Sequence, residues 1–226
     1  MLRTRFAALL AATGLLGAPL AASALLIDDF GGTQVSSIAI GPPNPKTDVT
    51  SAAASLGTRT IALERTAGFG AASADANSTA ANVFSLSTGP GVVANVTLRY
   101  DNFGAVDVTD GGASQLFQFS ARADQGALVT VSVLSAAGTS SFDFALAATG
   151  TGAADPFSLH SVSLAALVGT ADLTQVEAIT LAISGPASLD LQLGRIGTAP
   201  VPEPGAIALF GIGIAVVASR RRASRA

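Results

Sequence analysis

Apolar and polar residues alternate with a period of two along the middle of the chain. The clearest case is residues 92–100, where every second residue is apolar and Asn95, Thr97 and Arg99 fall on the opposite face. The same period recurs at residues 115–123, 128–134, 142–146, 178–183 and 189–193. Turn-forming residues such as Asp-Gly-Gly and Ser-Gly-Pro separate these runs. Strands at about twelve-residue spacing with polar turns predict an all-β fold, an antiparallel β-sandwich or jelly roll.

Two segments of this region have the composition of loops. Residues 41–57 hold three prolines, and residues 66–81 are almost entirely Ala, Ser, Gly, Asn and Thr. We expect both segments to be loops that bury little surface. No segment has a helical apolar stripe, although residues 164–168 and 172–176 are each long enough for one helical turn.

The first 24 residues have the composition of a secretory signal peptide. Arg3 and Arg5 precede an uncharged run, and Ala22 and Ala24 form a small-x-small cleavage site. We therefore predict a signal-peptide helix that passes through the Sec translocon and is removed by signal peptidase after Ala24. The alternative is an N-terminal membrane anchor that is retained.

The end of the chain carries a second apolar segment. Residues 205–218 are fourteen residues without a charge, about 21 Å of helix at ~1.5 Å per residue. A bilayer core is about 30 Å thick, so a transmembrane helix at residues 205–219 is short. Arg220, Arg221 and Arg222 can snorkel to the interface and orient that end toward the cytoplasm. The alternative is a buried C-terminal helix of the globular domain.

The residues before this segment are stiff. Pro202 and Pro204 cannot continue a helix and hold Glu203 in an extended tripeptide just outside the membrane. Val-Pro-Glu-Pro-Gly, the apolar span and the arginine cluster together resemble the PEP-CTERM sorting signal of Gram-negative bacteria. The resemblance implies recognition by an exosortase, a membrane-embedded cysteine protease, and implies that Pro202, Glu203 and Pro204 are the residues recognised. It also implies export across the inner membrane, a transient membrane anchor and delivery to the cell surface.

The predicted organisation is thus a signal peptide at 1–24, an exported β-sandwich domain at 25–197 and a sorting signal at 198–226. The middle domain has six basic residues against fourteen acidic ones, which gives no electrostatic footprint for nucleic acid. The chain has no cysteine, which excludes thiol nucleophiles, cysteine zinc sites and iron–sulfur clusters.

Hydrolase chemistry finds little support in the sequence. His160 is the only histidine, and no Gly-x-Ser-x-Gly elbow accompanies the neighbouring Ser158 or Ser161. His160 alternates with apolar residues on a predicted strand, so we interpret it as a surface or rim residue.

Calcium is the one cofactor for which candidate residues exist. Asp28 and Asp29 form one pair, and Asp107 and Asp110 lie together in a Gly-rich turn, where carboxylates can supply oxygen ligands. The spacing does not match an EF-hand, and solvated turn aspartates are the alternative.

Carbohydrate binding is a further hypothesis. Residues 26–30 and 172–196 resemble the opening and closing strands of galactose-binding-like jelly rolls, although residues 194–196 lack the aspartate that often ends such strands. The chain has no Trp and only Tyr100, which we expect in the core, so sugar would have to bind through polar groups. The leading hypothesis is an exported, non-catalytic structural or interaction protein of the exopolysaccharide layer. A carbohydrate-binding module is the alternative, and a secreted hydrolase is the third.

Overall fold

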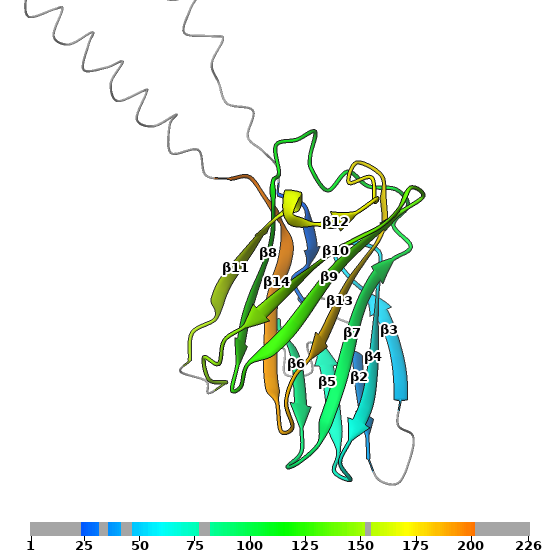
Figure 1. Ribbon diagram of the computed structural model, residues 1–226. Helices are drawn as coiled ribbons and strands as arrows, with labels where there is room; N and C mark the ends of the chain where they lie inside the picture. Colours follow the sequence, from blue (N-terminus) through cyan, green and yellow to red (C-terminus); the bar gives the residue numbers. More distant parts are fainter. Residues whose placement is uncertain (1–23, 32–35, 42–46, 77–81, 152–154, 202–226) are drawn as a thin grey trace, which may run out of the picture.

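Two antiparallel β-sheets pack face to face in the computed structural model (Figure 1). The structure describes residues 24–31, 36–41, 47–76, 82–151 and 155–201. The transmembrane helix predicted at residues 205–219 lies outside these ranges, as does the signal-peptide helix predicted at residues 1–24 except for its last residue. Within these ranges, no helix is long and apolar enough to cross a bilayer.

Each sheet has seven strands. Sheet A has the order β11-β8-β14-β6-β5-β2, and β1 also pairs with β14. Its strands are β1 (Leu26–Asp28), β2 (Ser36–Ile40), β5 (Ala72–Ala76), β6 (Phe84–Thr88), β8 (Leu116–Ala123), β11 (Ser158–Ser163) and β14 (Asp190–Ala199). Sheet B has the order β12-β10-β9-β13-β7-β4-β3. Its strands are β3 (Thr47–Ala53), β4 (Thr58–Ala67), β7 (Val93–Asp101), β9 (Ala127–Ser135), β10 (Gly138–Leu146), β12 (Val168–Gly169) and β13 (Val176–Ser184).

The chain passes repeatedly from one sheet to the other. β6 is followed by β7, β8 by β9, β10 by β11 and β13 by β14, and each of these steps changes sheets. Such crossing between two antiparallel sheets is a feature of jelly rolls. The all-β class and the antiparallel sandwich predicted from the alternation are therefore confirmed.

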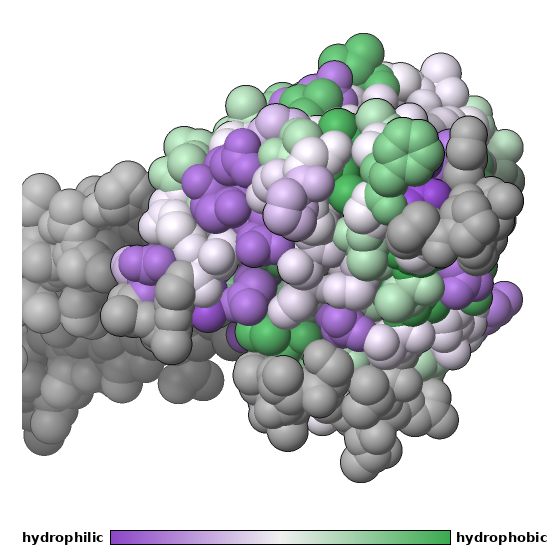
Figure 2. Space-filling view, turned by 90° about the horizontal axis from the view of Figure 1, so that it is seen from below, coloured by the Kyte–Doolittle hydropathy of each residue, from purple (hydrophilic) through white to green (hydrophobic). Residues whose placement is uncertain are grey.

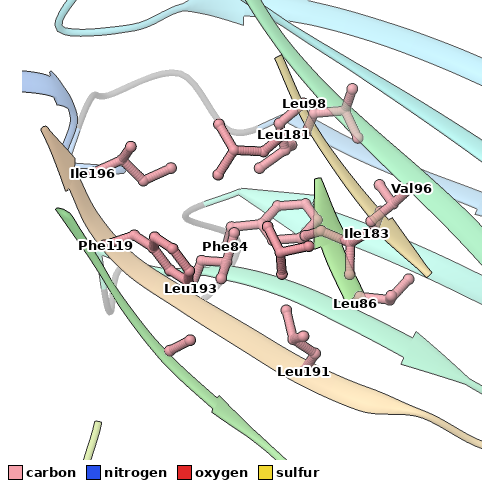
Figure 3. Close-up of a cluster of buried hydrophobic side chains, with 14 of the residues drawn as sticks. Phe84, Leu86, Val96, Leu98, Phe119, Leu181, Ile183, Leu191, Leu193 and Ile196 are labelled. Carbon is pink, nitrogen blue, oxygen red and sulfur yellow. The ribbon is translucent and has the colours of Figure 1, made fainter. Parts of the chain in front are cut away.

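The core lies between the sheets and is built from the alternating residues. In β7 and β8 every second side chain is buried, as the period of two predicts. Figure 3 shows part of this core, to which both sheets contribute. The labelled residues are Phe84, Leu86, Val96, Leu98, Phe119, Leu181, Ile183, Leu191, Leu193 and Ile196.

The two predicted loops are wrong in part. β3 lies within residues 41–57, and β5 lies within residues 66–81. In β5 the inward positions are Ala72, Ala74 and Ala76, all buried. These alanines alternate with Ser73 and Asp75, and the small alanine side chain gives too little hydrophobicity to reveal a strand. Pairing with β2 and β6 supplies the backbone hydrogen bonds that the side chains do not predict.

The two short helical segments have different outcomes. Leu164–Ala166 forms a single 3-10 turn, capped by the Ser163 side chain, which accepts from the Ala165 amide. Residues 172–176 contain a turn closed by a hydrogen bond from the Gln175 amide to the Asp172 carbonyl, and the strand β13 begins at Val176.

Candidate functional site

The two ends of the domain meet where β1 pairs with β14. The Thr198 amide donates to the Leu25 carbonyl (2.9 Å), and the Leu25 nitrogen donates to Thr198 Oγ1 (3.3 Å). Gly197 permits this approach, since a Cβ at that position would lie 2.5 Å from the Leu25 carbonyl oxygen. We call this contact between residues 25–26 and 197–198 the terminal junction. It places the residue after the predicted signal-peptide cleavage site beside the start of the predicted sorting signal.

The last strand is enclosed up to its final residue. Thr198 is only 3% exposed, and the Ala199 carbonyl accepts from the Gln115 amide. β14 thus continues two residues beyond residue 197, where the sequence predicts the end of the domain. Val201, the last described residue, is 42% exposed. Most of the site residues predicted at the two termini lie outside the described residues: Ala22 of the predicted cleavage site, the predicted recognition residues Pro202, Glu203 and Pro204, and Arg220, Arg221 and Arg222. Ala24 is described and is exposed.

Asp28, a calcium candidate, instead forms a buried ion pair. Its Oδ2 atom accepts from Arg59 Nη1 at 2.5 Å, and both side chains are 2% exposed. Its Oδ1 atom accepts from the Phe30 amide, and the Arg59 guanidinium lies 5.3 Å from the centre of the Phe30 ring. Because a guanidinium already compensates this carboxylate, Asp28 is poorly suited to bind calcium. The ion pair joins β1 of sheet A to β4 of sheet B.

Tyr100 lies beside this ion pair, and the prediction that it is a core residue is confirmed. Burial raises the pKa of the Tyr100 hydroxyl well above its usual value, and the nearby Asp28 carboxylate adds to the increase. Tyr100 therefore offers no exposed aromatic surface to a sugar.

The other calcium candidates bind their own turns. Asp29 Oδ1 accepts from the Gly31 amide (2.9 Å) and from Ser55 Oγ (3.3 Å). Asp107 accepts from the Thr109 hydroxyl and amide and from the Gly111 amide, and these bonds lower its pKa. Asp110 follows with a positive φ of 49°. Over the described ranges, no group of three or more His, Cys, Asp or Glu residues could hold a metal ion. A calcium site at Asp107 and Asp110 stays a prediction.

His160 packs at the rim of the core. Its ring centroid lies 5.3 Å from that of Phe119 and 5.1 Å from that of Phe144. Partial burial lowers the pKa of His160, so the imidazole is neutral near pH 7. Its aromatic neighbours make it a packing residue between the edges of the two sheets.

A line of polar side chains crosses the outer face of sheet A. Strand register places Arg122 opposite Gln192, Gln192 opposite Ser85, Ser85 opposite Asp75, and Asp75 opposite Ser37. We call these five residues the polar row. At ~4.8 Å per strand, the row spans about 19 Å. The polar row could not be predicted from the sequence, because β2, β5 and β6 are short strands rich in Ala or Ser and the row forms only when five strands are in register.

One end of the polar row is fixed by hydrogen bonds and an aromatic ring. Arg122 Nε and Nη2 donate to Gln192 Oε1 (2.9 and 2.7 Å), and Nη1 donates to the Asp155 carbonyl (2.6 Å). The guanidinium lies 4.7 Å from the centre of the half-buried Phe157 ring. This arrangement combines hydrogen-bonding groups with an aromatic surface, a combination suited to polar ligands.

An exposed aromatic residue lies at the end of the sandwich opposite the terminal junction. Phe69 is 90% exposed in the turn between β4 and β5. The turn is held by Arg65 Nη1, which donates to the Gly70 carbonyl (2.8 Å), and by the Gly89 amide, which donates to the Ala71 carbonyl. Figure 2 views the molecule from this end, where hydrophobic and hydrophilic residues are interspersed. Among the described residues, Phe69 is thus the only large aromatic side chain that is mostly exposed.

Comparison with known proteins identifies the end of the chain. Residues 200–222 match the family model of the PEP-CTERM protein-sorting motif. The chain therefore carries the sorting motif of exported proteins, and the resemblance noted from the sequence is confirmed. No curated protein matches the chain.

Several solved structures share the sandwich fold at low identity. The family 11 carbohydrate-binding module of the cellulosomal cellulase Lic26A-Cel5E of Clostridium thermocellum is 11% identical, with a TM-score of 0.42, and the match covers 80% of this chain and 96% of that one. The agarase AgWH50C is 13% identical with a TM-score of 0.45, and the match covers 79% of this chain and 26% of the agarase. The likeness is one of overall fold, and no functional assignment rests on it.

Proposed function

Because the chain ends in a PEP-CTERM sorting motif, we propose that it is an exported, non-catalytic protein of the cell surface and exopolysaccharide layer. An exosortase recognises Pro202, Glu203 and Pro204, after the Sec translocon and signal peptidase have acted on residues 1–24. The family match at residues 200–222 is the observation that carries the proposal.

The terminal junction supports the same proposal. Leu25 and Thr198 are hydrogen-bonded to each other, so both ends of the described domain lie at one end of the sandwich (Figure 1). Until signal peptidase removes residues 1–24, an N-terminal and a C-terminal membrane segment can therefore occupy the same membrane while the domain is folded. Termini at opposite ends of the sandwich would have separated the two segments by the length of a strand.

Alanine substitution tests the sorting role. Replacing Pro202, Glu203 and Pro204 together with alanine should abolish trimming and leave the protein in the membrane fraction of its host. The readout is the intact mass of the surface-extracted and membrane-bound protein, which reports both the cut after Ala24 and the cut near the motif. Pro186→Ala is the control, because this proline lies in the turn before β14. Normal trimming of the triple variant would contradict the proposal.

We propose carbohydrate binding as a second candidate function of the sandwich, supported by the polar row. Arg122, Gln192 and Phe157 form a pre-ordered cluster on an accessible sheet face, and a pre-ordered site loses little side-chain entropy on binding. The row's length matches an extended ligand better than a small molecule. The expected ligand class is therefore a polysaccharide chain that lies across the strands.

Retardation in native gels containing polysaccharide tests this second function. Arg122→Ala should weaken retardation by about tenfold in Kd, as expected for the loss of one charged hydrogen-bond donor. Arg99→Ala is the matched control, because Arg99 is also a partly exposed strand arginine and its Nε donates to Asp101 on sheet B (2.8 Å). Phe69→Ala reports on the exposed turn between β4 and β5. Equal retardation of wild type and Arg122→Ala would exclude the polar row, and loss with Phe69→Ala alone would move the site to the turn.

A further inference from the structure

The folded domain ends almost directly at the sorting motif. β14 pairs with β8 through Ala199, opposite Leu116, and with β1 at Gly197. Ile196 is fully buried between the sheets. The strand therefore cannot release its last residues without breaking pairs on both sides and exposing the core.

Only Pro200 and Val201 separate this strand from Pro202. Three residues of fully extended chain reach at most about 10 Å, and six residues, to Gly205, reach about 20 Å. The ring of Pro200 fixes its φ, and Val201 is restricted because it precedes a proline, so the two described residues of this connection have little backbone freedom. The ten residues of β14 alone measure about 33 Å. The tether is thus much shorter than the domain it carries.

A short, stiff tether restricts the directions from which a partner can approach. If residues 205–219 are in the membrane, the end of the sandwich lies close to the lipid headgroups, with the motif in the gap between them. A membrane-embedded partner must reach the motif in this gap, because the short tether does not allow the domain to rotate away from the membrane surface. Restricting the orientations of two partners lowers their rate of productive encounter.

We propose that the folded sandwich itself limits the rate at which the sorting motif is processed, by holding the motif at the end of the domain. This inference rests on the proposed sorting function and adds a regulatory element to it. The domain's attachment, rather than the motif's sequence, sets how quickly the partner gains access. The exported protein consequently remains membrane-associated for longer than a protein with a long flexible linker before the same motif.

Linker insertion in the full chain, in its native host, tests the proposal. Gly-Ser linkers of four, eight and twelve residues are inserted between Ala199 and Pro200, which leaves residues 200–222 intact. A flexible linker of twelve residues has an r.m.s. span of about 19 Å. Pulse-chase conversion of precursor to trimmed protein should accelerate by roughly two- to tenfold with increasing length and then level off.

The control insertion lies at the opposite end of the sandwich. Eight Gly-Ser residues between Ala147 and Ala148, in the exposed segment after β10, should leave the rate unchanged. Thermal unfolding of each variant checks that the domain is folded. Asp28→Asn without a linker loosens β1, which pairs with β14, so β14 should detach more often and this variant should also be trimmed faster. Conversion that is unchanged or slower at every linker length would overturn the proposal.

The outcomes also separate this inference from the sorting function. If alanine substitution of Pro202, Glu203 and Pro204 blocks trimming while linkers have no effect, the sorting function stands and the rate limit is wrong. If the triple variant is trimmed normally, the sorting function fails, and the rate limit falls with it.

Discussion

Asp28→Asn is expected to lower the free energy of unfolding of the exported domain by about 3–5 kcal/mol, because it leaves the Arg59 guanidinium buried without its counter-charge. Such a loss is a large share of the ~5–15 kcal/mol that stabilises a typical domain. At about 2–4 °C per kcal/mol for a domain of this size, the midpoint of thermal unfolding should fall by roughly 6–20 °C. Circular dichroism of purified residues 25–201 measures it.

The neighbouring aspartate provides a matched control. Asp29 is next in sequence and also accepts two hydrogen bonds, but its contacts are exposed. Asp29→Asn should therefore change the stability by less than about 1 kcal/mol. If Asp28→Asn also lowered the free energy of unfolding by less than about 1 kcal/mol, the ion pair would not be a major stabilising contact.

A double replacement separates lost attraction from an uncompensated charge. Asp28→Leu combined with Arg59→Met removes both charges and keeps apolar volume in the core. Replacement of buried ion pairs by apolar residues is often neutral or stabilising. The double variant should therefore be more stable than Asp28→Asn, and the difference measures the cost of burying Arg59 alone.

Only some of the strands could be predicted from the sequence. Alternation located β7, β8 and β9 because large aliphatic and aromatic residues contrast with polar ones along those strands. It missed β5, where alanine takes the inward positions, and β3, where a single inward residue, Ala52, is buried. Small side chains give weak contrast, so these strands are defined by backbone pairing that only the assembled sheet provides.

The candidate sites also differ in whether the sequence alone could predict them. The sorting motif is a contiguous signal read directly from residues 200–222, and its prediction needed no tertiary structure. Asp28 was singled out as an acidic residue, but its partner is 31 positions away and meets it only when the sheets pack. The polar row depends on the register of five strands, so its members are scattered along the chain from Ser37 to Gln192.

The terminal junction leads to a second large effect, which concerns where the chain can be cut. A chain that ends at Val201 should unfold at the same temperature as one with the whole tail, because all strands are complete by Ala199. A chain that ends at Arg195 loses Ile196 from the core and the pairs that join β14 to β1 and to the first half of β8. Loss of a buried isoleucine alone costs about 2–5 kcal/mol, and the lost strand pairing adds to it.

We therefore expect the chain ending at Arg195 to be unfolded or to melt at least about 10 °C lower, and to be degraded rapidly by added protease. Thermal unfolding and limited proteolysis of the two truncated proteins measure the difference. Equal stability would mean that β14 is dispensable beyond Arg195 and that the junction does not anchor the tail. With this asymmetry, the proposed cut near Pro202 to Pro204 would release the domain from its tail in a folded state, whereas a cut at Arg195 would unfold it.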